Sequence, residues 1–146
     1  MSVRAVGLDL GSKRIGVALS DSDGTMALPY EVLQRTGDRE RDHRRIAQIV
    51  AETEAQIVVV GMPYSLDGGV GPTAKRYRAE ARTLRGALQV PVETYDERLT
   101  TVTAERALKE TQLSGRARRQ VVDQVAAAVM LQSWLDHRAR GEEPST

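Results

Sequence analysis

Three carboxylates occupy positions where most of their neighbours are apolar. Asp9 lies inside the run AVGLDL, Glu97 follows the run VETYD, and Asp123 lies in VVDQVAAAVM. Strand interiors disfavour Asp, and a carboxylate withdrawn from water must be protonated, paired or bound to a metal. Carboxylates without a nearby histidine make a poor acid–base set at neutral pH but good oxygen ligands for Mg²⁺ or Mn²⁺. We therefore predict a divalent-metal site formed by Asp9, Glu97 and Asp123.

Two of these acids have an alternative explanation as ion pairs. Asp9 has Arg14 close by in sequence, and Asp123 has Arg119 four residues earlier, which is one turn away in a helix. If those pairs form, the two carboxylates support folding rather than chemistry.

A phosphodiester is the substrate that such a metal site favours. Two divalent ions about 4 Å apart promote in-line attack, one by activating water and the other by stabilising the leaving oxygen. Their combined charge exceeds that of the three carboxylates, which leaves positive charge for a phosphate. Several cations are predicted to hold flanking phosphates of a nucleic acid without reading its sequence: Lys13, Arg14, Arg98, Arg116, Arg118 and Arg119.

A β-hairpin over residues 7–21 is expected to position the first acid. Bulky residues alternate with small ones on both strands, so each strand has one apolar face and one nearly bare face on which a ligand could lie. Asp9 falls on the bare face. Gly11 and Ser12 are expected to form the turn, with glycine chosen because it tolerates positive φ.

The remaining pattern predicts an α/β fold with a mixed five-stranded sheet, three antiparallel strands being followed by alternating helices and strands. One domain over residues 1–139 and a flexible C-terminal tail over 140–146 are expected. The predicted elements are an edge strand at 25–34 containing Pro29, a helix at 36–55, a buried strand at 57–61, a helix from Pro72, a strand at 90–95, a helix from about 100 to 109, a polar flexible connection at 111–120 and a last helix from about 117 to 138.

Charged stretches lie on two of the predicted helices. We expect His43, which lies among arginines, to be a solvated surface residue. The helix after Pro72 has a basic face, either for phosphate or merely solvated, on which Glu80 is the accompanying acid. Residues 106–119 form the most one-sided basic patch of the chain.

Composition excludes several other kinds of site. The 146 residues include no cysteine and only two histidines, so disulfides, thiolate metal sites and histidine-rich zinc sites are not expected. Four tyrosines and one tryptophan are too few for a base-stacking platform. There is no signal-like apolar run at the start and no apolar span of 18 residues, so we expect a cytoplasmic protein without a membrane partner.

Four segments together resemble the YqgF/RuvX family, Holliday-junction resolvases of the ribonuclease-H-like superfamily that are also described as pre-16S rRNA nucleases. They are GLDLGSKRIGVALSD, VVVGMPYSLDGG, DERLTT and VVDQVAAAVMLQSWLD, in family order and spacing. Carried over by position, the family's acids fall on Asp9, Glu97 and Asp123. The resemblance implies a ribonuclease-H-like fold and a cytoplasmic bacterial nuclease, dependent on Mg²⁺ or Mn²⁺, that matures the 5′ end of pre-16S rRNA.

Three alternatives stay open at this point. The substrate could be a branched DNA junction, for which a homodimer would supply two active sites. The acids could be retained in a non-catalytic nucleic-acid-binding module. The segment DLGSKRIGVAL is also similar to the phosphate hairpin of actin-like ATPases and sugar kinases, but those proteins need two such domains and this chain has the length of one.

Overall fold

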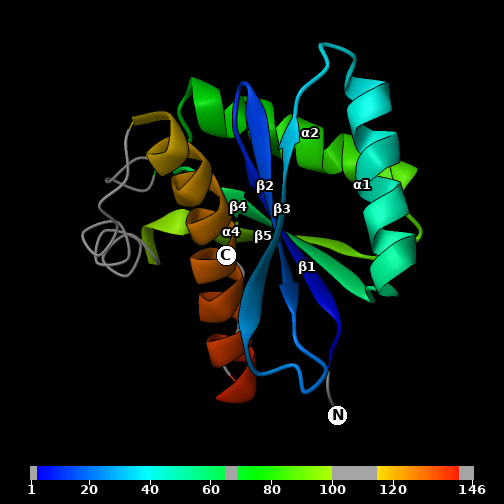
Figure 1. Ribbon diagram of the computed structural model, residues 1–146, viewed down its shortest axis with the longest axis vertical. Coiled ribbons are helices and arrows are strands. Elements are labelled where there is room, and N and C mark those ends of the chain that lie inside the picture. Colours follow the sequence, from blue (N-terminus) through cyan, green and yellow to red (C-terminus); the bar gives the residue numbers. More distant parts are fainter. Residues whose placement is uncertain (1–2, 65–68, 100–114, 142–146) are drawn as a thin grey trace.

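The computed structural model describes residues 3–64, 69–99 and 115–141, without the side chains of residue 99 and residues 115–124. A five-stranded sheet in the order β3-β2-β1-β4-β5 forms its centre (Figure 1). The first three strands are antiparallel, whereas β4 runs parallel to β1 and β5 parallel to β4, which confirms the predicted mixed sheet. The elements are β1 (Ala5–Leu10), β2 (Arg14–Ser20), β3 (Ala27–Gln34), α1 (Arg39–Thr53), β4 (Ile57–Met62), α2 (Pro72–Ala87), β5 (Val92–Asp96), the short 3₁₀ helix η1 (Glu97–Leu99) and α4 (Gly115–Ala139).

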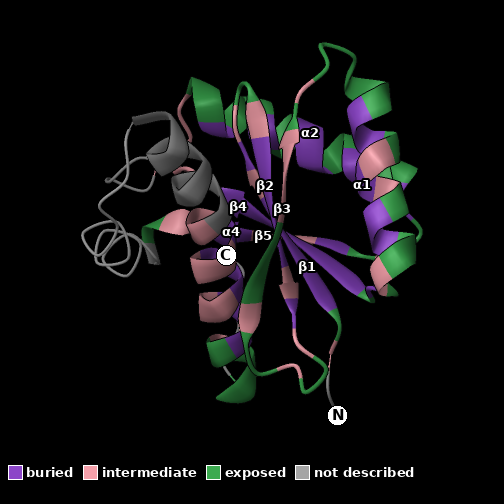
Figure 2. Cartoon of the chain, viewed as in Figure 1, coloured by how far each residue is buried: buried purple, intermediate pink, exposed green. Residues whose placement is uncertain are grey.

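Helices cover both faces of the sheet. α1 and α2 lie on one face and α4 lies on the other (Figure 1). The alternation along the hairpin produces this arrangement, because Leu8 packs in the cluster with Ile46 of α1 and Leu84 of α2. Ala18, on the opposite face of the hairpin, packs with Trp134 of α4. Strand β4 is buried along its whole length, as expected for an interior strand (Figure 2).

The bare face of the hairpin receives a helix rather than a ligand at its middle. A Cβ atom at Gly7 would lie only 2.9 Å from the Cβ atom of Leu131 in α4. The expectation that a ligand could lie on this face is therefore wrong at Gly7. The missing side chain allows α4 to approach the sheet closely.

Gly11 is required in the β1–β2 turn for a different reason from the one predicted. Its φ angle is not in the positive region, but its N–H donates to the carbonyl oxygen of Arg14 at 2.8 Å. A Cβ atom at position 11 would lie 2.6 Å from that oxygen. Close approach of the backbone, not backbone conformation, excludes larger residues here.

Strand β3 forms one edge of the sheet, as its proline predicted. Pro29 pairs with Ala18, and a bulge interrupts the register between Val17 and Ala18. Proline has no N–H to donate, so an edge position with a bulge accommodates it.

Helix α1 begins after Asp38, whose Oδ1 accepts the backbone N–H groups of Glu40 and Arg41. The predicted apolar stripe of Ile46 and its neighbours faces the sheet. The prediction for His43 is wrong, because only 3% of this residue is exposed. It extends the buried stripe by one turn toward the start of the helix.

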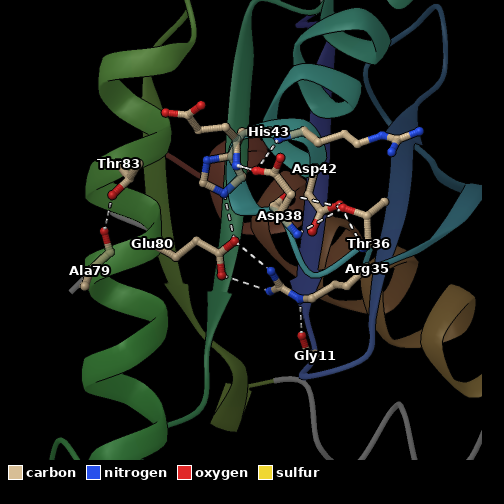
Figure 3. A network of polar contacts seen from close by, with 11 residues as sticks. Gly11, Arg35, Thr36, Asp38, Asp42, His43, Ala79, Glu80 and Thr83 are labelled. Atoms are coloured by element: carbon tan, nitrogen blue, oxygen red, sulfur yellow. Dashed lines mark hydrogen bonds and ion pairs between the residues drawn. The ribbon is translucent and has the colours of Figure 1, made fainter.

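A buried network joins α1, α2 and the β1–β2 turn (Figure 3). The Glu80 carboxylate accepts both terminal nitrogens of the Arg35 guanidinium at 2.9 Å and contacts Nε2 of His43 at 2.8 Å. The Nε–H of Arg35 donates to the carbonyl oxygen of Gly11 at 2.7 Å. Glu80 is 1% exposed, so it does not belong to the solvated basic face of α2 where the sequence placed it.

The last helix starts earlier than predicted. The backbone of α4 is helical from Gly115, so the expected flexible connection is wrong over residues 115–120. Residues 111–114 and the helix predicted at about 100–109 lie outside the described residues. Trp134 and Leu135 belong to the core, as predicted. Among the helices that are described, none has the length and apolarity needed to cross a membrane.

Candidate active site

Two of the three predicted acids lie together at one end of the sheet. Asp9 is the penultimate residue of β1, and Glu97 follows β5 directly as the first residue of η1. Both strands flank β4 and run parallel to it, so their carboxyl ends meet at the same edge. Ligands bind beyond the carboxyl ends of strands in open α/β sheets.

The carboxyl groups of Asp9 and Glu97 share a hydrogen bond. Burial, the negative charge of Asp9 and this hydrogen bond raise the pKa of Glu97 to about 9. Two carboxylates held this close cannot both stay ionised without a cation, so one of them keeps a proton. A divalent ion would take the place of that proton. The donor set therefore fits Mg²⁺ or Mn²⁺, which prefer carboxylate oxygen.

Gly61 of β4 makes the space for Glu97, a role that the sequence analysis missed. A Cβ atom at position 61 would lie 2.6 Å from Oε1 of Glu97. The available signal was a glycine inside the apolar run IVVVGM, because glycine in a strand interior indicates a close approach by another group.

Gly61→Ala is expected to displace the Glu97 carboxylate and weaken divalent-ion binding at least about tenfold, since even groups that only orient ligands contribute that much. Titration with Mn²⁺, followed by calorimetry, measures this. Gly86→Ala is the matched control, because nothing lies within 4 Å of a Cβ atom there. Wild-type affinity in Gly61→Ala would contradict the assignment of Glu97.

The neighbouring acid, Asp96, is engaged elsewhere. It is 3% exposed, and its Oδ2 accepts Nε of Arg98 at 2.9 Å while its Oδ1 accepts the backbone N–H of Arg98 at 3.0 Å. Burial alone would raise the pKa of Asp96, but the hydrogen bonds and charge of Arg98 lower it below its usual range. Asp96 is thus a carboxylate that holds an arginine, not a metal.

The third acid lies on α4, and its side chain is outside the described residues. Gln132 of α4 bonds the backbone of Thr25 and Ala27 near the far end of the sheet, and Leu131 lies over Gly7. Asp123 is eight residues earlier than Leu131, about 12 Å along the helix toward the end that holds Asp9. No group of three or more metal-type ligands occurs among the described side chains. Asp123 therefore remains a predicted ligand.

The predicted phosphate-binding residues fall into three groups. Lys13, in the β1–β2 turn, is exposed, and Arg14, the first residue of β2, is half-buried. Arg98 pairs with Asp96 and has its guanidinium 5.9 Å from the ring centre of Tyr64. The remaining three lie on the first turns of α4, at the same end of the sheet as the turn (Figure 1), and their side chains are not described: Arg116, Arg118 and Arg119.

Comparison with known proteins places this arrangement in context. Two relatives are each named "Putative pre-16S rRNA nuclease". The one from Rhodococcus opacus (strain B4) is 50% identical over 141 residues, which cover 94% of this chain and 79% of that protein. The one from Pelotomaculum thermopropionicum is 47% identical over 138 residues, which cover 94% and 90%.

Solved structures show the same fold at low sequence identity. The structure described as T. thermophilus RuvC in complex with Holliday junction substrate matches with a TM-score of 0.63 and 16% identity, covering 97% of this chain and 99% of that one. The sequence profile of a family described as RuvX, Holliday junction resolvase, matches residues 3–137. The chain therefore belongs to the RuvX family, and its sheet and covering helices have the fold of RuvC.

Proposed function

We propose that the protein is a divalent-metal-dependent nuclease that hydrolyses phosphodiester bonds during 5′-end maturation of pre-16S rRNA in the cytoplasm. The carboxyl pair of Asp9 and Glu97 at the carboxyl edge of the sheet is the observation that carries the proposal. The names of the relatives at about half identity support rRNA as the substrate.

Asp9 and Glu97, together with Asp123, would hold Mg²⁺ or Mn²⁺, which activates water for attack on phosphorus and stabilises the leaving oxygen. Glu97 would hold such an ion as a carboxylate, since the charge of a bound cation would offset the repulsion from Asp9 that retains the proton. Gly61 leaves room for the Glu97 carboxylate beside β4. Lys13 and Arg14, which follow Asp9 in the hairpin, bind the phosphate backbone next to the scissile bond.

A branched DNA junction is the second candidate substrate. The family description names Holliday junction resolvases, and a RuvC structure with a similar fold contains a Holliday junction. Resolution of a symmetric junction requires two active sites, so this candidate also requires a homodimer.

One experiment separates these candidates. A labelled pre-16S rRNA 5′ end and a labelled four-way DNA junction are incubated with wild-type protein in Mg²⁺ or Mn²⁺. We expect cleavage of the RNA and an intact junction. Cleavage of the junction alone would establish the second candidate. Binding of both without cleavage in either metal would favour the non-catalytic binding module.

Replacing Arg116, Arg118 and Arg119 together with alanine is expected to weaken nucleic-acid binding about equally for all sequences. If each contacts a phosphate, the slope of log affinity against log salt falls by about 2 to 3. The matched control is a triple variant in which alanine replaces three arginines at the opposite end of the sheet, Arg4, Arg138 and Arg140. Equal slopes for the two triple variants would indicate bulk charge rather than contact by α4.

A further inference from the structure

A cation-lined concavity lies beside the candidate active site. It has a volume of about 450 Å³ and is bounded by the β1–β2 turn, the end of β3 and the start of α1, with Ser12, Lys13, Gln34, Arg35, Gly37 and Arg39 in its wall. The turn and the end of β3 are joined, because Arg14 pairs with Gln34 and the N–H of Arg35 donates to the carbonyl oxygen of Lys13 at 2.8 Å. Asp9 pairs with Gly16 beside the same turn, so the concavity is at the same end of the sheet as Asp9.

Its charges favour an anion. Lys13 and Arg39 are exposed, and neither forms an ion pair with a residue of the part of the chain that is described. Asp42 also lines the concavity, but it is buried. Its Oδ1 accepts two hydrogen bonds from Thr36, one from the backbone N–H at 3.1 Å and one from the side-chain hydroxyl at 2.8 Å. The positive charge of Arg35 is balanced by Glu80. With the Asp42 carboxylate counted, the described residues of the wall still have one positive charge in excess, since Lys13 and Arg39 have no ion-pair partner among those residues.

The wall of the concavity is held rigidly. The Arg35 guanidinium is fixed by the buried Glu80 carboxylate and by the Gly11 carbonyl oxygen (Figure 3). Asp38 already accepts the first free N–H groups of α1. An anion would consequently be held by the side chains of Lys13 and Arg39 and not by the helix terminus. None of the described residues that line the space is aromatic, so these residues do not form a surface for base stacking.

We propose that this concavity binds a backbone phosphate of the nucleic-acid substrate other than the scissile one, with Lys13 and Arg39 as its cationic contacts. The inference rests on the proposed nuclease function. Neighbouring strands are about 4.8 Å apart, so β3, two strands from β1, lies about 10 Å from Asp9. That offset is too large for the phosphate attacked at the carboxyl pair. Arg39 is the residue that this proposal adds to the substrate contacts.

The test measures binding without cleavage, in a chain that carries Asp9→Asn. In that background Arg39→Ala is expected to weaken nucleic-acid binding about three- to tenfold at 0.15 M salt and to lower the log–log salt slope by about 0.7 to 0.9. Arg41→Ala is the matched control, because Arg41 is exposed on the first turns of the same helix but does not line the concavity. It should change neither quantity.

A series of substrates, each with one phosphate replaced by a neutral methylphosphonate, locates the contact. One substrate in the series has its methylphosphonate at the phosphate that the concavity binds, away from the scissile bond. For that substrate, Arg39→Ala should cause no loss of binding beyond the loss that the methylphosphonate itself causes. Equal effects of Arg39→Ala and Arg41→Ala, or additive losses at every position, would overturn the proposal. Because binding is scored with a cleavage-inactive chain, failure of the nuclease proposal would appear separately, as absent cleavage by wild type with the Arg39 contact intact.

Discussion

Asp9→Asn is expected to lower the cleavage rate more than about 100-fold while nucleic-acid binding changes less than twofold. Asparagine keeps the shape of the side chain but removes the charge that a divalent ion needs. Groups that merely orient metal ligands contribute about 10- to 100-fold, so a ligand itself should contribute more. The variant should fold, because the change also removes the repulsion that raises the pKa of Glu97.

Three measurements are needed to interpret that variant. Cleavage is followed at saturating substrate, binding by salt titration, and folding by thermal denaturation without metal. Asp23→Asn, at an exposed turn acid, is the matched control and should cleave like the wild type. If Asp9→Asn cleaved at the wild-type rate, the carboxyl pair would not be the metal site; if binding and cleavage fell together, Asp9 would be needed for the fold.

The second large effect is on stability. Glu80→Gln is expected to lower the free energy of unfolding by about 3 to 5 kcal/mol, because it removes the charge of a buried carboxylate that pairs with Arg35, whose side chain is only 15% exposed. Glu52→Gln is the matched control. Glu52 lies 3.5 Å from Arg45 in an exposed pair, and such pairs contribute about 0 to 1 kcal/mol. Urea denaturation at pH 7 measures both, and equal losses would show that burial of the network contributes nothing.

The same network predicts how stability depends on pH. Burial would raise the pKa of Glu80, but hydrogen bonds from His43 and Arg35 outweigh it and lower the pKa to about 2 from an ordinary value near 4.5. The folded state therefore binds the proton less well than the unfolded state. The stabilisation is complete above pH 4.5 and is lost as the pH falls toward 2, with a total on the order of 3 kcal/mol. Glu80→Gln should flatten the stability curve over this interval.

Local pattern was sufficient for the elements whose signal is strong. The alternation around Asp9 predicted the hairpin, and the run IVVVG predicted an interior strand, because each pattern depends on one face or both faces being buried. Asp9 and Glu97 were grouped in advance because each is a carboxylate among apolar neighbours, and such groups need a proton, a partner or a metal.

The buried polar network could not be predicted from residue type. His43 is three residues before Ile46, and Glu80 is three after Tyr77, so both lie on the buried stripes of their helices. Their charges suggested solvent instead. Only the packing of α1 against α2, together with Arg35 from the end of β3, makes a buried charge acceptable there. Whether such residues are buried depends on their ion-pair partners in other elements, and the sequence of a single helix does not show those partners.

The position of α4 makes one face of the fold depend on contacts between distant parts of the sequence. This helix is the most C-terminal of the described elements, and it alone among them covers its face of the sheet. Ala18 and Val59 on that face are covered only when α4 packs against them. The contact of Gly7 with Leu131 joins residues more than 100 positions apart, and contacts between residues so distant in sequence slow the folding of a domain.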